Sequence, residues 1–201
     1  MSKTIVLVPD QHADPDHNND RADWIGRLIA DVKPDMVVDI GDAADMASLS
    51  SHDLVHGRSY ERDIESHLDF QERLFRPMKN THRKQPRRVF CVGNHEYRIT
   101  RTIKEHPELA GGRFGISLKD LELDRAYHNV VHYENDIPGI IRIEGIDFAH
   151  YFISGVMGQP VGGVNHARSI LLKHMNSGIQ GHSHLVDYSE MTNAAGHTKQ
   201  A

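Results

Sequence analysis

The chain of 201 residues contains one cysteine, Cys91, and one tryptophan. A single cysteine excludes an internal disulfide and is typical of a protein in a reducing compartment. Cys91 lies inside the apolar run Val89-Phe90-Cys91-Val92, which indicates a buried side chain rather than a nucleophile. The sequence also lacks any run of about 18 apolar residues, so it predicts no membrane-spanning helix.

The sequence has no excess of positive charge and no signal-peptide pattern. Its net charge of −5 argues against a general nucleic-acid coat or a membrane-surface binder. Nucleic-acid ends are still possible substrates, because metal ions can supply positive charge. The N-terminus lacks a cleavage pattern and is expected to form the first strand. We therefore expect a cytoplasmic protein, in the host cell if it is phage-encoded.

Apolar runs typical of strands alternate with segments of helical periodicity, which predicts an α/β fold. Strands are expected at 4–8, 36–40, 88–92, 130–133, 140–144 and 146–149. Helices are expected at 21–32, 48–54, 60–78, 98–106, 117–123 and 163–175. We find no linker, so residues 1–201 should form a single domain. Because only 17 residues follow His184, the C-terminal strands are expected to be short or the chain incomplete.

Histidine is abundant, with 16 residues, and several histidines fall in short clusters with Asp or Asn behind predicted strands. In an open α/β sheet such loops meet at the carboxyl edge. Carboxylate, amide and imidazole groups are ligands for divalent cations, and paired cations can hold a phosphate while they activate water. The clusters are Asp10-Gln11-His12, Gly41-Asp42-Ala43-Ala44-Asp45, Gly93-Asn94-His95-Glu96, His150 and Gly181-His182-Ser183-His184.

In this order the clusters resemble those of the calcineurin-like metallophosphoesterase superfamily, over essentially the whole chain. The resemblance implies a four-layer α/β/β/α sandwich with a binuclear metal site at the carboxyl ends of the strands. The first metal would be bound by Asp10, His12, Asp42 and His184. The second would be bound by Asp42, Asn94, His150 and His182, with Asp42 as the bridge.

The resemblance also implies the catalytic roles. His95 would be an unligated imidazole that contacts the phosphate and protonates the leaving oxygen. Glu96 would orient that imidazole or its loop. Asp42 would hold both ions, between which a hydroxide would attack phosphorus in line. The oxygen and nitrogen ligands favour Mn²⁺, with Fe, Zn²⁺, Ni²⁺ or Mg²⁺ as alternatives.

The substrate prediction rests on departures from the pattern. Protein phosphatases of the superfamily extend the second motif to Gly-Asp-x-x-Asp-Arg-Gly, whereas this chain has Met46 and Ala47 in place of the Arg and Gly. We therefore favour a phosphodiesterase or nuclease acting on nucleic-acid ends or on cyclic or small nucleotides. A phosphomonoesterase and a non-catalytic binding module of the same fold are the alternatives.

Other assignments stay open at this stage. His150 is a lone histidine, with His128, His132, His166 and His174 as rivals. Asp45 is expected either to orient a ligand or only to form a turn. Arg98, Arg101 and His52 are candidates for substrate contacts; the alternative is that they are ordinary surface residues. A basic stretch before the third long strand predicts a phosphate-binding patch or, as its position favours, an exposed connector; it comprises Lys79, Arg83, Lys84, Arg87 and Arg88.

Overall fold

The computed structural model describes residues 3–51, 57–79, 84–111 and 114–201. Its first sheet is parallel, in the order β1-β2-β3-β4. The strands are β1 (Ile5–Val8), β2 (Met36–Asp39), β3 (Arg87–Cys91) and β4 (Asn129–Val131). Each strand lies beside the next one in the chain, so all four carboxyl ends meet at one edge.

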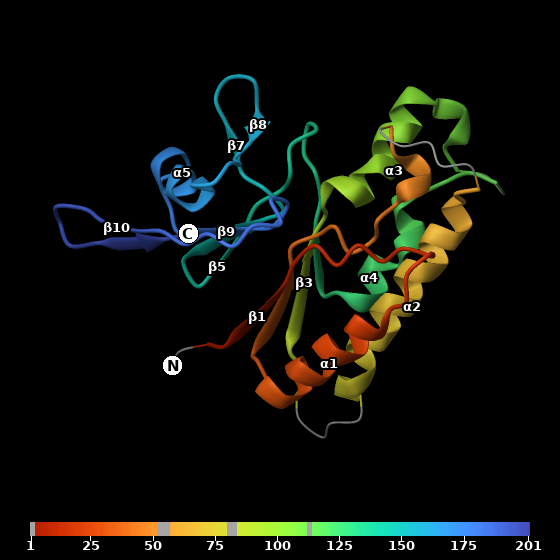
Figure 1. Ribbon diagram of the computed structural model, residues 1–201, viewed down its shortest axis with the longest axis horizontal. Coiled ribbons are helices and arrows are strands. Elements are labelled where there is room, and N and C mark those ends of the chain that lie inside the picture. Colours follow the sequence, from red (N-terminus) through yellow and green to blue (C-terminus); the bar gives the residue numbers. More distant parts are fainter. Residues whose placement is uncertain (1–2, 52–56, 80–83, 112–113) are drawn as a thin grey trace.

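Two helices, α1 (Asp20–Val32) and α2 (Tyr60–Lys79), cover one face of this sheet (Figure 1). Successive strand residues point to opposite faces, so Val37 and Phe90 pack against these helices. The two helices approach closely at Gly26, where an added Cβ would lie 2.4 Å from the Leu74 carbonyl oxygen. A larger residue at position 26 would push the helices apart.

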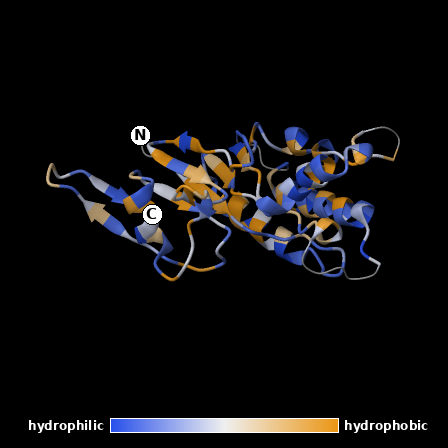
Figure 2. Ribbon diagram, turned by 90° about the horizontal axis from the view of Figure 1, so that it is seen from above, coloured by the Kyte–Doolittle hydropathy of each residue, from blue (hydrophilic) through white to orange (hydrophobic). Residues whose placement is uncertain are grey.

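The opposite face packs on a second sheet, made of β5 (Ile141–Ile143), β6 (Ile146–Ala149) and β9 (Gly178–Gln180). Val38 and Val89 from the first sheet meet Phe148 from the second in a separate core. Helix α5 (His166–Lys173) then covers the outer face of the second sheet, where Ile170 packs with Phe152. The order of layers is therefore α/β/β/α, which confirms the predicted fold, and Figure 2 shows apolar residues gathered along these strands.

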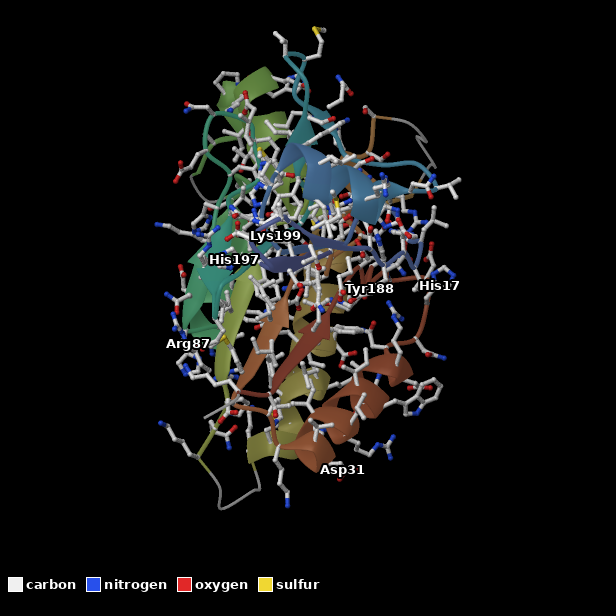
Figure 3. All side chains as sticks on the ribbon, turned by 90° about the vertical axis from the view of Figure 1, so that its left-hand side faces the viewer. His17, Asp31, Arg87, Tyr188, His197 and Lys199 are labelled. Atoms are coloured by element: carbon white, nitrogen blue, oxygen red, sulfur yellow. The ribbon has the colours of Figure 1, made fainter. Side chains whose placement is uncertain are left out.

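The remaining elements are helix α3 and several short segments. They are η1 (Ala47–Leu49), α3 (Asn94–Glu105), η2 (Pro107–Leu109), η3 (Leu118–Leu121), α4 (Leu123–Ala126), and the hairpins β7 (Ile153–Ser154) with β8 (Gln159–Pro160) and β10 (Glu190–Thr192) with β11 (Thr198–Gln200). Figure 3 labels Tyr188, which precedes the β10–β11 hairpin, and two residues in it, His197 and Lys199. No described helix is both long and apolar enough to cross a membrane.

Two predictions about helices were wrong. The helix expected at 98–106 begins at Asn94, inside the third cluster, because Glu96 accepts a hydrogen bond from the Gly93 amide (2.8 Å) and so fixes the first turn. The helix expected at 48–54 is only the 3-10 turn η1, and residues 52–56 lie outside the described part. Neither short hairpin was predicted.

Candidate metal centre

The five clusters converge at the carboxyl edge of the two sheets. Asp10, Asp42 and Asn94 follow β1, β2 and β3, while His150 and His182 follow β6 and β9. This placement agrees with the rule for ligand sites in open α/β sheets. The convergence of the clusters therefore follows from the order of the strands.

The first group of donor atoms comes from Asp10, His12 and His184, whose ligand atoms all lie within 4.8 Å of one another. His12 Nε2 lies 3.1 Å from His184 Nε2. The His184 side chain is 58% exposed, so this group opens to solvent. The backbone amide of His182 donates to Asp10 Oδ1 (2.9 Å) and ties the first loop to the last one.

The second group comes from Asp42, His150 and His182, again within 4.8 Å. His150 Nε2 lies 3.2 Å from Asp42 Oδ2 and 2.8 Å from Asn94 Oδ1. His150 is fully buried. This group thus lies in the interior, in contrast to the first.

None of the four rivals of His150 belongs to a described donor group. His128 Nδ1 accepts from the Arg88 amide, and His174 Nε2 lies 2.7 Å from Asp147 Oδ2. His166 Nδ1 lies 3.0 Å from the Gly163 carbonyl oxygen. Of the five histidines, His150 alone contacts Asp42.

The imidazoles are oriented for metal binding by partners on their other ring nitrogens. His150 Nδ1 lies 2.8 Å from the Ile40 carbonyl oxygen, so it carries the proton and leaves Nε2 as the donor atom. His12 Nδ1 lies 3.0 Å from Asp45 Oδ1, with the same effect. Metal-binding histidines commonly have such partners. The oxygen and nitrogen donors, held in this way, fit a pair of divalent ions.

Several residues of the centre have backbone conformations that side chains other than glycine rarely adopt. Such residues tend to cluster at functional sites, where the surrounding structure holds them in place. An added Cβ at Gly181 would lie 2.5 Å from Asp10 Oδ2, so this position also requires glycine. The candidate ligands with positive φ are Asp10 (46°), His12 (46°), Asp42 (53°), His182 (65°) and His184 (53°).

Glu96 is fully buried and joins the second and third loops. Its carboxylate accepts hydrogen bonds from the amides of Asp42 (3.0 Å) and Ala44 (2.9 Å), besides the bond from Gly93. No described bond joins it to the His95 ring. Of the two roles considered for Glu96, its contacts therefore match fixing the loop and not orienting the imidazole.

The His95 side chain lies beside Asp42, with its Nε2 3.7 Å from Asp42 Oδ2, and is 16% exposed to solvent. Its backbone amide donates to Asp42 Oδ1 (2.9 Å), and its Nδ1 lies 2.6 Å from the Asp45 carbonyl oxygen and 3.2 Å from Asp45 Oδ1. Arg98 Nη2 lies 3.1 Å from His95 Nε2. His95 also forms a third potential donor group with His12 and Asp42.

Asp45 contacts both His12 and His95 through one carboxylate oxygen. These hydrogen bonds hold the pKa of the Asp45 carboxyl well below its usual range, against a smaller effect of burial. Its contacts match the orienting role rather than a simple turn. Sequence reasoning left this choice open, and the spacing Asp42-x-x-Asp45 was the only signal for it.

Burial and neighbouring charges shift the pKa values of the buried groups. Burial alone would raise the pKa of Asp42, but the hydrogen bond from His150 and the nearby His150 and His95 lower it well below the usual range. Burial alone would lower the pKa of His150, but the hydrogen bond and charge of Asp42, together with the Ile40 carbonyl and the charge of Glu96, raise it. Burial, with the neighbouring His150, lowers the pKa of His182. The cluster is thus pre-formed as carboxylate facing imidazole.

A layer beneath the ligands was missed by sequence reasoning. Asp39, at the end of β2, accepts hydrogen bonds from the Gly41 amide (3.1 Å), Gln11 Nε2 (3.3 Å) and the Tyr127 hydroxyl (2.8 Å). Gln11 adjoins Asp10, and Gly41 adjoins Asp42, so Asp39 supports both loops. A buried polar residue in an apolar strand was the available signal.

The candidates for substrate contact differ in their surroundings. Arg98 donates to the carbonyl oxygens of Asp45 (2.8 Å) and Met46 (3.3 Å) as well as to the His95 ring. Arg101 forms no hydrogen bond or ion pair with any described residue, and its charge lowers the pKa of Arg98 after the larger effect of burial. His52 lies outside the described residues.

A model of the calcineurin-like phosphoesterase family matches residues 3–193 of the chain. This range includes every residue of the donor groups. No curated protein shows significant similarity to the sequence.

Proposed function

Because the chain belongs to the calcineurin-like phosphoesterase family, we propose that it is a metal-dependent phosphodiesterase. The family supports metal-dependent hydrolysis of phosphate esters in general, and the candidate ligands for the metals are present. One observation carries the proposal: two groups of donor atoms are linked by a third, in which His12 of the first group and Asp42 of the second meet the His95 imidazole.

The residues divide between two metal positions. Asp10, His12, Asp42 and His184 would bind one ion, and Asp42, Asn94, His150 and His182 the other. Two divalent ions would supply positive charge to the phosphoryl oxygens and lower the pKa of bound water. Mn²⁺ is the ion we propose, because all the donors are oxygen or nitrogen and Cys91 is buried elsewhere.

His95 is proposed as the general acid. Asp45 accepts a hydrogen bond from Nδ1, which fixes the orientation of the ring and leaves Nε2 3.7 Å from Asp42 Oδ2. The proton on Nε2 would then pass to the leaving oxygen of the ester. In the structure an Arg98 N–H donates to Nε2, so this nitrogen would carry its proton only after Arg98 Nη2 moves away.

A diester is favoured over a monoester by the charges around His95. A monoester dianion carries more charge than a diester and gains more from an additional free guanidinium. Arg98 Nη1 is already held by two carbonyl oxygens. The residues that extend the motif in protein phosphatases are also replaced, by Met46 and Ala47. Nucleic-acid ends and cyclic or small nucleotides are the substrates that we propose.

A monoesterase is the second candidate, and Arg101 is the observation in its favour. This guanidinium has no partner among the described residues and lies close enough to Arg98 to affect its pKa. It could therefore neutralise a second phosphate charge. Arg101→Gln would then depress monoester hydrolysis much more than diester hydrolysis.

A substrate panel with added Mn²⁺ tests the proposal. The panel contains bis-p-nitrophenyl phosphate, p-nitrophenyl phosphate, cyclic nucleotides, and single- and double-stranded DNA. We expect a higher kcat/KM on the diester than on the monoester, with Asp42→Asn as the control for contaminating activity. Preference for the monoester, or equal rates in Asp42→Asn and the parent protein, would contradict the proposal.

A further inference from the structure

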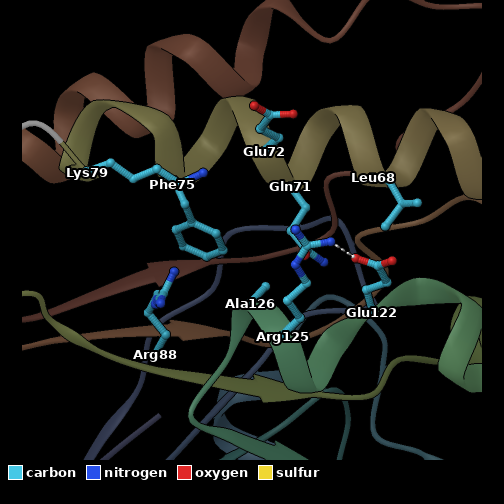
Figure 4. A pocket seen from close by; sticks show the side chains of 9 residues that line it. All are labelled: Leu68, Gln71, Glu72, Phe75, Lys79, Arg88, Glu122, Arg125 and Ala126. Atoms are coloured by element: carbon cyan, nitrogen blue, oxygen red, sulfur yellow. Dashed lines mark hydrogen bonds and ion pairs between the residues drawn. The ribbon is translucent and has the colours of Figure 1, made fainter.

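A cavity of about 490 Å³ lies at the end of the parallel sheet opposite the metal centre. It is bounded by helix α2, helix α4 and the start of β3 (Figure 4). Its volume falls within the range of small-molecule sites, about 300–1,000 Å³. Arg88 is the second residue of β3 and Asn94 follows the end of this strand, so roughly 15–20 Å separate the cavity from the candidate metal centre, at about 3.3 Å per residue.

Arg88 is the unusual residue of this cavity. Its guanidinium carbon lies 4.7 Å from the centroid of the Phe75 ring. Its Nε is buried and has no hydrogen-bond partner, and no described oxygen accepts from the rest of the guanidinium. Arginine stays charged and carries five N–H donors. A half-buried guanidinium without an acceptor is costly unless a ligand supplies one.

The other charges around the cavity do not neutralise Arg88. Arg125 Nη1 pairs with Glu122 (2.6 Å), so these two charges cancel. Lys79 adds a positive charge at the rim, while Figure 4 shows Glu72 pointing away from Phe75 and Arg88. Among the described residues, Arg88 is therefore a half-buried cation of this cavity that forms no ion pair and lies over the face of an aromatic ring.

Its walls explain what kind of anion would fit. Phe75 and Ala126 are buried, and with Leu68 they form an apolar surface next to Arg88. A bare inorganic ion would leave this surface in contact with water. An anion with an aromatic or apolar body would cover it while its oxygens bind the guanidinium.

We propose that this cavity, the Arg88 pocket, binds a small organic anion. Carboxylate or phosphate oxygens would accept hydrogen bonds from Arg88, and the body of the ligand would pack on Phe75. The pocket lies too far from the metals for a small ester to occupy both. It is thus a separate ligand site, and its existence does not depend on the proposed phosphodiesterase activity.

The basic stretch before β3 is reinterpreted accordingly. Arg87 donates to Asn129 Oδ1 (2.7 Å) and projects to the surface, as Figure 3 shows. Its neighbour Arg88 turns inward to the pocket. The prediction of an exposed connector therefore applies to Arg87 but was wrong for Arg88, and Arg83 lies outside the described residues. Arg87 is the matched control for Arg88.

The test follows the Arg88 Nε–H signal in ¹H–¹⁵N spectra of the metal-loaded protein. The probes are benzoate and phenylphosphonate, which share a ring but differ in the anion and are not substrates. We expect a saturable shift of the Arg88 signal at millimolar concentrations. A shift with benzoate alone assigns a carboxylate ligand, and a shift with phenylphosphonate alone assigns a phosphate ligand.

Two variants complete the test. Arg88→Gln should lose probe binding, read at the Ala126 amide, and keep hydrolysis of bis-p-nitrophenyl phosphate, whereas Arg87→Gln should keep both. If Arg88→Gln does not fold, Leu68→Trp fills the pocket from its rim and should abolish the Arg88 shift. The proposal is overturned if neither probe moves the Arg88 signal of the parent protein, or if Leu68→Trp binds both probes unchanged.

Discussion

The two donor groups at the sheet edge contain similar residues but differ in burial. In the second group His150 is fully buried and contacts both Asp42 and Asn94. In the first group the His184 side chain is 58% exposed and lies against His12. A buried and hydrogen-bonded group needs less reorganisation to bind an ion. We therefore expect the second position to bind its metal more tightly and the first to exchange more readily.

The largest effect is expected where the two groups meet. Asp42→Asn removes the charge that faces His150, His95 and His12. We expect loss of metal from both positions and no measurable turnover, as read by elemental analysis and hydrolysis of bis-p-nitrophenyl phosphate. Asp31→Asn, on the exposed end of α1, should change neither. Retention of both ions in Asp42→Asn would show that Asp42 is not shared.

His95→Asn should lower activity without disturbing either group. General acids typically contribute about 10²–10⁴-fold, and we expect a loss of that order with both metals bound. The loss should be smaller for p-nitrophenyl esters, because p-nitrophenolate leaves with little need of a proton. Equal losses on good and poor leaving groups would mean that His95 stabilises the phosphate instead. Loss of metal would mean that His95 is a ligand.

Single ligand substitutions should separate the two positions. His150→Ala should weaken the second position and leave the first filled, and His184→Ala should do the reverse. Changes to groups that only support ligands cost about 10–100-fold in affinity, so we expect at least the upper end of that range. Metal titrations of each variant provide the measurement. If His150→Ala left metal affinity unchanged while His132→Ala or His166→Ala clearly weakened it, the assignment of His150 as a ligand would be wrong.

Asp45→Asn should weaken metal binding at the first, more exposed position more than at the second, buried one. Asp45 bonds His12 but does not contact His150. We expect about 10–100-fold weaker binding at the first position, with little change at the second. Turnover should also fall, because the His95 ring loses a carboxylate that orients it. Unchanged turnover with unchanged metal affinity would reduce Asp45 to a turn residue.

The smallest expected effect concerns Asp39, beneath both loops. Burial raises the pKa of its carboxyl to about 7, whereas in the unfolded chain it is about 3.9. The folded state thus holds a proton that the unfolded state releases, and this stabilisation is lost as pH rises from about 4 through 7. In metal-free protein the difference in unfolding free energy between the parent and Asp39→Asn should therefore shrink between pH 5 and pH 8. A constant difference would mean that Asp39 is ionised throughout.

The two parts of the site also differ in how far the sequence could predict them. The ligands of the first three loops follow strands directly, so local patterns located Asp10, Asp42 and Asn94 at one edge. A local pattern was not enough to place His150, because its position depends on the pairing of β6 with β9 in the second sheet. The choice of His150 among five histidines rested on its place after a strand rather than on any contact.

Other features depend on contacts that local patterns do not encode. Helix α3 begins at Asn94 because Glu96 is held by Gly93, Asp42 and Ala44, two of which lie more than 50 residues away in the chain. Asp39 is polar within an apolar strand, and its partners Gln11 and Tyr127 come from different segments. The hairpins are too short for periodicity to reveal them.

Metal counting tests the central claim most directly. Metal-free parent protein is dialysed against increasing Mn²⁺, and the bound ions per chain are measured at each concentration. We predict two ions per chain, taken up in two steps, with the tighter step lost in His150→Ala and the weaker step lost in His184→Ala. A plateau at one ion per chain, or none, would contradict the binuclear site.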